Sequence, residues 1–472
     1  MLAVHASPFS GTWYPAQAAV LDRLLEERFE LSQTRTGPYL LGDALGFVVP
    51  HAGPEYSGVV AAAVYRSLRQ QQPERIVLLA FPHHGGLQGA AVPKVRAVST
   101  PLGSVTIDPF LSSSFPRVDE ALVCDHSFEI QLPFLQKAAP QARLCPLYVG
   151  SVNADERRAL AEALAVDWRP GTVLVASSDF THYGRSFGYV PFPADQRIAE
   201  RLRELDAECI EAAGSLDSGF FLKSLAETGA TVCGAGPISL LLSVLNRVSP
   251  DDLFQSTLDY QTSGETTGDF RHSVSYAALG YFPRSAFVLN GEDREALLHS
   301  AELTLQRLRD TGRRDPARPV GSIALESRRG VFVSLHRDSE LLGCMGHCPG
   351  YSALSEAVPE LALAAALEDP RFRPGDAVAG PFAIEISVLT PLRRIRTVAD
   401  FRIGLHGGLL RLGAMSGLLL PQVAPRRGWT AETFCEALSQ KSGLASHAYQ
   451  DPAARLYVFE AQTFGRGPNR PV

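Results

Sequence analysis

Short, continuous apolar segments of strand length recur through the first half of the chain, at residues 45–49, 76–79, 145–149 and 172–176. Residues 58–68, between the first two segments, have a helical pattern. A strand, a helix and a second strand joined by short loops form a βαβ pattern, and short continuous apolar runs are typical of buried strands. The pattern therefore predicts an α/β domain built around an open sheet.

Further elements follow from the spacing of apolar residues, because helical spacing predicts an amphipathic helix and short apolar or alternating runs predict strands. The predicted helices are residues 16–31, a stretch ending near residue 138, residues 155–165 and residues 237–245. The predicted strands are residues 95–99, residues 105–107 and a closing strand at residues 272–282.

A break in the pattern near residues 283–291 separates this region from the rest of the chain. Beyond it, the pattern predicts helices at residues 292–309, 354–367 and 430–442, and strands at residues 331–335, 382–389 and 404–412. Strands and helices do not alternate regularly here, which indicates an α+β domain. We therefore expect two domains, residues 1–285 and residues 291–472.

Composition narrows the class of protein. The chain has 472 residues, 45% of them hydrophobic, and a net charge of −6. This length suits two or three domains, and the charge argues against a general nucleic-acid or membrane-surface binder. The sequence has no apolar run of the ~18 residues that a membrane-spanning helix needs, and no signal-peptide pattern. The seven cysteines are odd in number and widely spread, unlike a disulfide framework. These features predict a cytoplasmic protein.

Four polar loops carry side chains that can bind a metal ion. We assign these loops to strand ends, and their residues are His51, His83 with His84, Asp179 with His182, and Cys233. Ligands of open α/β sheets bind outside the carboxyl ends of the strands, so we expect the loops at one edge. Imidazole and thiolate together suit iron, copper or zinc better than magnesium or calcium. Two histidines and one anionic ligand would leave metal positions open for dioxygen, water or substrate.

Other polar residues are expected beside this metal site. Asp179 and His182 are candidates for acid–base or ligand-orienting roles. His84, His126 and Glu129 are candidates for contacts with substrate. Simpler interpretations stay open, because a single histidine can be a hydrogen-bonded loop residue, Asp179 can cap the next segment, and a lone cysteine can be an inert core thiol.

A second candidate site lies in the C-terminal half. The stretch Gly343-Cys344-Met345-Gly346-His347-Cys348 spaces two thiols around a histidine, which allows metal binding or thiol redox chemistry. We favour a simpler interpretation, a glycine-rich turn that holds small buried thiols. Glu385 stands within an apolar strand, where it either faces solvent or acts as a pocket acid. Cys344 and Glu385 are the residues of this second candidate site.

Residues 4–283 resemble the Memo family. The matching stretches are Ser10-Gly11-Thr12-Trp13-Tyr14, Pro50-His51-Ala52-Gly53, His83-His84, Asp125-His126-Ser127-Phe128-Glu129, Ser177-Ser178-Asp179-Phe180-Thr181-His182 and Cys233-Gly234. The resemblance implies a fold similar to class III extradiol ring-cleaving dioxygenases, and a metal held by His51, His83 and Cys233. The departures are Phe81-Pro82 before the histidine pair, Gln131 where a histidine is common, and Pro54 where an aromatic residue is usual.

Residues 292–466 resemble the AMMECR family. The matching stretches are Leu341-Leu342-Gly343-Cys344-Met345-Gly346, Leu367-Glu368-Asp369-Pro370-Arg371-Phe372, Glu385-Ile386-Ser387-Val388-Leu389-Thr390-Pro391, Gly417-Leu418-Leu419-Leu420-Pro421-Gln422-Val423, and Gly428-Trp429 with Glu432-Thr433-Phe434. Leu342 replaces the arginine of the family's best-known stretch. Memo-type, AMMECR-type and radical-SAM proteins are grouped as the AmmeMemoRadiSam system, so the resemblance implies a radical-SAM partner.

Two hypotheses for the function follow. In the first, the chain is a metal-dependent, dioxygenase-like oxidoreductase, with one iron or copper ion acting on a small organic substrate. His182 would then transfer protons, and Asp179 would hold the tautomer of His182. In the second, the chain is a non-catalytic adaptor that binds a metal or a peptide, and Cys233 is a reactive thiol rather than a ligand. Turnover that depends on a metal separates the two hypotheses.

Overall fold

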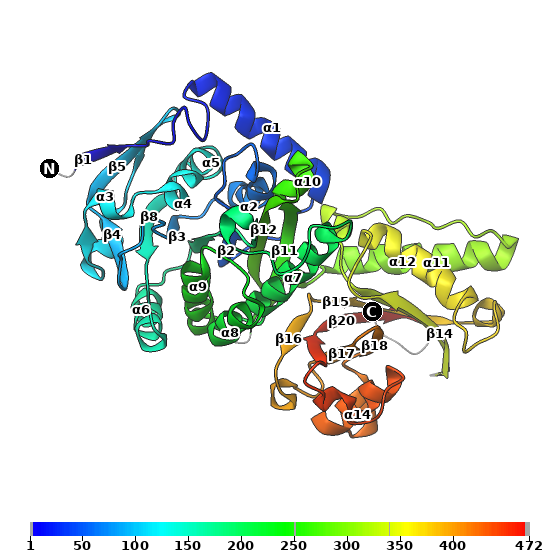
Figure 1. Cartoon of the computed structure of the whole chain (residues 1–472). Coiled ribbons are helices and arrows are strands. Elements are labelled where there is room, and N and C mark those ends of the chain that lie inside the picture. Colours follow the sequence, from blue (N-terminus) through cyan, green and yellow to red (C-terminus); the bar gives the residue numbers. More distant parts are fainter. Residues whose placement is uncertain (1–2, 250–251, 339, 468–472) are drawn as a thin grey trace. The chain divides into compact units, whose positions relative to one another are not determined.

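The computed structural model describes residues 3–249, 252–338 and 340–467, and the chain divides into two units between Ala286 and Phe287 (Figure 1). The outer ends of the two predicted domains, residues 1–2 and 468–472, lie outside the described residues. Within the described part of the chain, no helix combines the length and the apolar character that crossing a membrane requires.

A mixed β-sheet forms the centre of the first unit, with the strand order β10-β12-β2-β9-β3-β8-β4-β7 and β11 paired to β12. The strands are β2 (Gly46–Val49), β3 (Arg75–Ala80), β4 (Ala90–Pro93), β7 (Arg117–Val118), β8 (Arg143–Val149), β9 (Thr172–Ser177), β10 (His182–Gly184), β11 (Leu253–Thr262) and β12 (His272–Pro283). The four predicted apolar strands are β2, β3, β8 and β9, which run parallel at the middle of the sheet.

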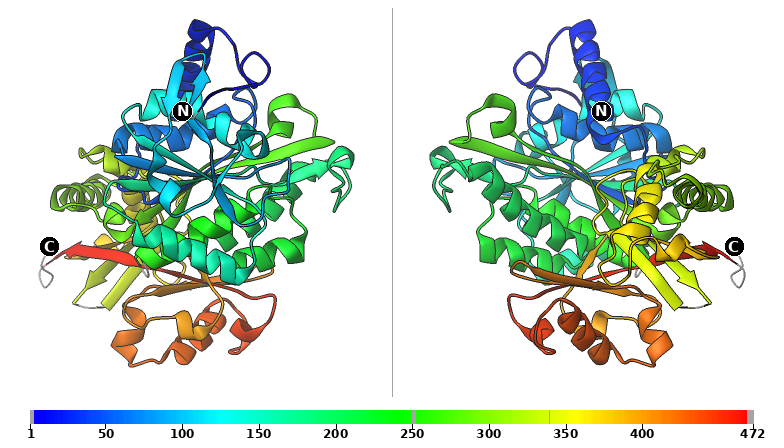
Figure 2. Two further views of the ribbon diagram at one scale, coloured as in Figure 1. Left: turned by 90° about the vertical axis from the view of Figure 1, so that its left-hand side faces the viewer. Right: turned by 90° about the vertical axis from the view of Figure 1, so that its right-hand side faces the viewer.

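Helices cover both faces of this sheet (Figure 2). On one face α2 lies against β2 and β12, with α1 and α5 against α2; on the other face α9 lies against the parallel strands, and α6 and α8 pack on α9. The helices are α1 (Ala18–Thr36), α2 (Gly58–Gln71), α5 (Gln131–Ala138), α6 (Ala154–Val166), α7 (Ile198–Gly214), α8 (Ser218–Thr228), α9 (Ala235–Val248) and α10 (Ser263–Thr267). Because both faces are covered, the central strands are apolar throughout.

A small second sheet and two short helices complete the first unit. β1 (Ala3–Ala6) pairs in parallel with β5 (Val95–Thr100), which pairs with β6 (Gly103–Thr106). The short helices α3 (Glu120–Val123) and α4 (His126–Glu129) begin at Asp119 and Asp125, whose carboxylates accept backbone N–H groups of the first turn. Such N-caps fix where each helix starts, and so fix the side chains between them.

The second unit contains two four-stranded sheets, ordered β14-β13-β15-β20 and β16-β19-β17-β18. The strands are β13 (Val331–Arg337), β14 (Glu340–His347), β15 (Ala383–Leu389), β16 (Arg393–Ile395), β17 (Gly407–Leu412), β18 (Met415–Leu419), β19 (Arg455–Phe459) and β20 (Ala461–Arg466). The helices are α11 (Gly291–Thr311), α12 (Leu354–Leu367), α13 (Val423–Arg427) and α14 (Ala431–Lys441). α11 and α12 pack together beside the β14-β13-β15-β20 sheet, and α14 contacts β17 and β18 of the other sheet.

The interpretation of residues 343–348 as a glycine-rich turn is wrong, because most of this stretch belongs to strand β14. Its glycines serve close packing. A Cβ atom at Gly343 would lie 2.0 Å from the carbonyl oxygen of Ala365 in α12, and one at Gly346 would lie 2.2 Å from the Phe332 ring. The glycines therefore mark a tight approach of backbone and side chains within an extended strand.

Candidate metal centre

Three of the predicted loops meet at the carboxyl edge of the parallel strands. Val49 of β2 stands opposite Ser177 of β9, and Leu79 of β3 stands opposite Ala176, so the three strands end nearly level. The loops that follow carry His51, His83 and Asp179, as the parallel arrangement predicts.

The prediction that the Cys233 loop follows a strand is wrong, because this loop connects helices α8 and α9. Gly234 makes this approach feasible: its N–H donates to Ser178 Oγ at 2.9 Å, and a Cβ atom there would lie 2.4 Å from Ser178 Cβ. The absence of a side chain at Gly234 thus lets the Cys233 loop rest on the end of β9.

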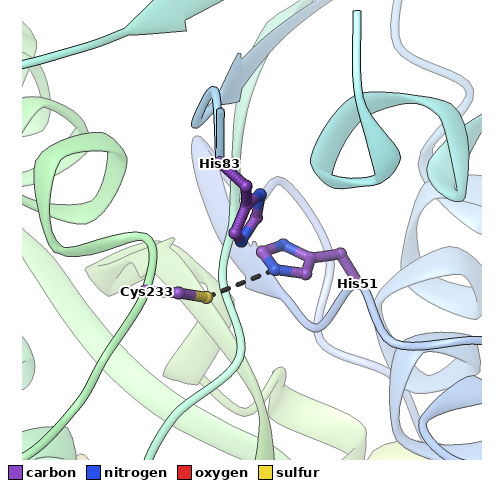
Figure 3. Close-up of side chains that lie close together, drawn as sticks. All are labelled: His51, His83 and Cys233. Atoms are coloured by element: carbon purple, nitrogen blue, oxygen red, sulfur yellow. Dashed lines mark hydrogen bonds between the residues drawn. The ribbon is translucent and has the colours of Figure 1, made fainter. Parts of the chain in front are cut away.

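His51, His83 and Cys233 lie together and present ligand atoms within 4.8 Å of one another (Figure 3). The Cys233 sulfur is 3.2 Å from His51 Nε2, and the two imidazole rings stand edge to face with centroids 5.1 Å apart. Three donors at such separations can converge on one ion with a small adjustment of side chains.

A buried hydrogen-bond chain orients the His51 ring. Its Nδ1 lies 3.0 Å from Ser177 Oγ, and this hydroxyl oxygen accepts from the side-chain amide of Gln131 at 3.0 Å. Gln131 in turn accepts from the Tyr65 hydroxyl and donates to the Pro50 carbonyl. In the sequence, Gln131 is visible only as a departure from the family pattern, and neither Ser177 nor Tyr65 has a predicted role, because residues this far apart in sequence become partners only in the fold.

His83 is held by Asp125, whose Oδ2 accepts both from the His83 backbone N–H at 2.6 Å and from its Nδ1 at 2.9 Å. This leaves Nε2 as the metal-binding nitrogen, in the carboxylate–histidine arrangement common around protein metals. Burial alone would raise the pKa of Asp125, but hydrogen bonds from His83 and Ser127 outweigh it and lower that pKa. The carboxylate is therefore ionised and fixes the tautomer of His83.

His126 completes a group of three imidazoles. Its ring stacks on His83 with centroids 3.9 Å apart and lies 5.2 Å from His51. Burial, reinforced by the neighbouring imidazoles, lowers the pKa of His51 and of His126 to about 3. Both rings are therefore neutral near pH 7, the state in which imidazole binds metals. Trp13, from the N-terminal stretch Ser10-Gly11-Thr12-Trp13-Tyr14 for which we predicted no role, packs on His126 with ring centroids 4.7 Å apart.

The Cys233 thiol is protonated in the absence of a metal, because burial raises its pKa well above the ordinary value and the nearby Asp179 carboxylate raises it further. The backbone N–H of Asp179 donates to the sulfur at 3.3 Å and acts in the opposite direction. A metal ion would displace this proton, because the thiolate is the form that coordinates.

Asp179 and His182 lie beside the cluster, and their hydrogen-bond partners differ from those we predicted. Asp179 Oδ1 accepts the backbone N–H of His51 at 2.8 Å and so shapes the His51 turn. The ring nitrogen Nδ1 of His182 lies 2.9 Å from the Phe180 carbonyl and 3.0 Å from the Thr231 carbonyl. These carbonyls, rather than Asp179, fix the tautomer of His182 and leave its Nε2 available.

The remaining candidates separate. His84 is exposed in the same loop as His83. Glu129 is fully buried and its carboxylate bonds to His5, in a different cluster from the metal centre. In the second unit, Cys344 and Glu385 stand on either side of Ser334 in register across β14, β13 and β15, and the Ser334 hydroxyl donates to the Cys344 sulfur at 3.2 Å.

Two family models match separate parts of this chain. A Memo-like protein model matches residues 6–280, and an AMMECR1 model matches residues 298–464. A MEMO1 family protein of Methanopyrus kandleri is 33% identical over 57% of this chain and 96% of its own. The memo-1 homolog of Caenorhabditis elegans is 29% identical over 58% of this chain and 81% of its own. The uncharacterized protein PH0010 of Pyrococcus horikoshii has a solved structure that is 30% identical over 38% of this chain and 94% of its own, with a TM-score of 0.35.

Proposed function

We propose, from the premise that this chain belongs to the Memo-like family and carries an AMMECR1 domain, that its first unit is a metal-dependent oxidoreductase acting on a small organic substrate. The observation that carries the proposal is the convergence of His51, His83 and Cys233 at the carboxyl edge of a parallel sheet. Iron is the metal we propose, with copper as the alternative, on the family's similarity to extradiol dioxygenases.

The residues fit such an ion. Two imidazoles and a thiol form a donor set of intermediate softness, which suits iron, copper or zinc. Each histidine has its Nδ1 engaged, His51 with Ser177 and His83 with Asp125, so that each can offer Nε2. Three protein ligands leave coordination positions free for a substrate.

Side chains around the metal site can transfer protons, hold the ligand loops and contact the substrate. A redox-active metal held by the three ligands would supply electron transfer and Lewis-acid polarisation. His182, held by carbonyls at Nδ1, can accept or give a proton at Nε2. Asp179 keeps the His51 turn in place through the backbone N–H. His126 and the Trp13 ring form an aromatic wall beside the imidazoles, suited to contact with a planar substrate.

The grouping of Memo-type and AMMECR-type proteins with radical-SAM proteins leads us to propose a radical-SAM protein as partner. In this proposal a substrate passes between the radical-SAM protein and this chain. Cys344 and Glu385 of the second unit are the residues that would contact that substrate. Co-purification of a radical-SAM protein with the tagged full-length chain from its native host is the direct measurement, and its absence under oxygen-free conditions counts against the partnership.

The metal proposal is tested by purifying the full chain without oxygen and measuring its metals by elemental analysis. We expect near-stoichiometric iron or copper, lost in His51→Ala and in Cys233→Ala. Cys209→Ala removes a buried thiol of the same unit that lies in the hydrophobic core, and should keep the metal. A wild-type chain that takes up neither ion when both are supplied would overturn the proposal and favour a non-catalytic, peptide-binding adaptor.

A further inference from the structure

A second group of metal-ligating side chains lies in the first unit, separate in its donors from the centre described above. His5, Cys124 and Glu129 present a nitrogen, a sulfur and a carboxylate oxygen within 4.8 Å of one another. They come from three segments: His5 from strand β1, Cys124 from the turn between α3 and α4, and Glu129 from α4. Residues so far apart in sequence are brought together here by the small sheet and the capped helices.

The environment of the Glu129 carboxylate indicates that a ligand is missing. Its side chain is 0% exposed, and its Oε1 bonds to His5 Nε2 at 2.9 Å. Its other oxygen, Oε2, is also buried, and within the described part of the chain it has no hydrogen-bond partner. A buried carboxylate oxygen without a partner is costly, by about 1–3 kcal/mol or more. One histidine therefore does not satisfy this group.

Carboxylates lie on both sides of the His5 ring. Its Nε2 faces Glu129, while its Nδ1 lies 3.6 Å from the carboxylate of Glu120. The contact with Glu120 is longer than a hydrogen bond, and a carboxylate that closes on the far nitrogen fixes the tautomer of a metal-binding imidazole. The His5 side chain is 16% exposed and Cys124 is partly exposed, so an ion has a path from solvent.

We propose that His5, Cys124 and Glu129 bind a divalent ion of the zinc class, with Glu120 orienting His5. One nitrogen, one sulfur and one oxygen donor form a set that Zn²⁺ accepts readily, and three protein ligands leave a fourth position for water. When the ion binds, the Cys124 thiol loses its proton to solvent. The ion also supplies a positive counter-charge for the buried Glu129 carboxylate. An ion pair between His5 and Glu129 alone leaves Glu129 Oε2 without a partner among the described residues.

This site adjoins the elements that hold the first metal centre. Cys124 and Glu129 flank Asp125, which anchors His83, and His126, which stacks on His83. An ion at the second site would therefore also hold the segment at residues 124–129 in place. The proposal does not depend on which metal the first centre holds, or on whether that centre is catalytic.

Cobalt(II), a spectroscopic substitute for zinc, tests the proposal in the full chain. The metal-free Cys233→Ala variant removes the thiolate of the first centre, so a sulfur-to-cobalt charge-transfer band must come from another cysteine. We expect Cys233→Ala to bind Co²⁺ with such a band, and Cys233→Ala/Cys124→Ala to lack it. Cys233→Ala/Cys348→Ala is the matched control, since Cys348 is also partly exposed, and should keep the band.

A second measurement covers any loss of folding in the Cys124 variant. In the otherwise unaltered chain, Zn²⁺ should protect Cys124 from alkylation by a maleimide, read by peptide mass spectrometry, and Glu129→Gln should abolish this protection while keeping the wild-type circular dichroism. Glu120→Gln should weaken Zn²⁺ binding about 10–100-fold, the usual effect of losing an orienting carboxylate. A charge-transfer band that survives in Cys233→Ala/Cys124→Ala, or alkylation of Cys124 that Zn²⁺ does not slow, would overturn the proposal.

Discussion

Two residues of the first metal centre, His51 and Cys233, respond to burial in opposite directions. Burial lowers the pKa of His51 to about 3 and raises the pKa of the Cys233 thiol. Without a metal, the pair is therefore a neutral imidazole and a neutral thiol across most of the pH range. Of these two ligands, only Cys233 has a proton to lose when the ion binds.

This asymmetry predicts the pH dependence of metal binding. Between about pH 7.5 and 8.5, where unperturbed imidazoles are already neutral, the metal's association constant should rise about tenfold per pH unit, because one proton leaves for each ion bound. The measurement is competition with a chelator of known affinity at several pH values. Cys233→Ala should bind more weakly and with a flatter pH dependence. A hundredfold rise per unit would show that a second group is deprotonated and would contradict the assignment.

Asp369 is a second residue whose environment predicts a measurable effect. Its carboxylate bonds to Arg371 and accepts the Cys344 backbone N–H at 2.8 Å, and the bond to Arg371 is the main reason that its pKa falls to about 2. This value is below that of an unfolded aspartate, about 3.9. The carboxylate therefore stabilises the fold above pH 4, and this contribution disappears as the pH falls from about 4 to 2.

Asp369→Ala should accordingly lower the free energy of unfolding of the second unit by about 1.5–3 kcal/mol at pH 7, the range for hydrogen bonds to charged groups. The difference from the wild type should shrink toward pH 2. Urea unfolding at several pH values measures both. Arg371→Ala is the control: its side chain is 56% exposed, so its loss should cost less than about 1 kcal/mol. Equal effects of the two variants would mean that the bond to Cys344 contributes little.

At the scale of elements, hydrophobic periodicity located the central strands and most of the helices, because a strand buried on both faces must be apolar. It missed β14, since the glycines that let this strand approach α12 also resemble a turn. It missed β11, whose exposed and half-buried positions carry polar side chains. The candidate metal ligands could be inferred from loops after strands and from a family resemblance. The roles of Ser177 and Gln131 in orienting His51 could not, because hydrogen bonds between distant segments leave no local sequence pattern.

The loop between α8 and α9 yields the prediction that belongs to this scale. Gly234→Ala adds no donor and removes none, but its Cβ would lie 2.4 Å from Ser178 Cβ and 2.5 Å from the Ser177 carbonyl. The loop must move away from β9 and carry Cys233 with it. We expect metal affinity to fall at least tenfold, an estimate based on the strictness of metal–ligand geometry.

Gly236→Ala is the matched control for this change. It lies in the same segment, and a Cβ atom there would meet its nearest neighbours at 3.6 Å, an ordinary contact distance. Metal binding should therefore stay close to the wild-type value, and alanine should be tolerated within the first turn of α9. If both variants bind metal as the wild type does, the close approach of Gly234 is not what places Cys233.

At the scale of the whole molecule, the two units have separate hydrophobic cores. One large cluster lies between the central sheet and α6 to α9 in the first unit, and two clusters lie within the second. Both candidate metal sites draw all their donors from the first unit. A unit with its own core and its own ligands has what it needs to fold and to bind metal by itself.

Residues 1–286, expressed alone, should therefore bind the same number of metal ions as the full chain, with affinities within about threefold, a difference of only about 0.6 kcal/mol. Residues 287–472 should fold cooperatively and leave the metal content of the first unit unchanged when mixed with it. Elemental analysis and chelator competition on both fragments measure this. If the first fragment folds, as judged by circular dichroism, but loses metal that the second fragment restores, the second unit supports the metal centre directly. The fusion would then act on the metal itself, and not merely raise the effective concentration of two domains that share a substrate.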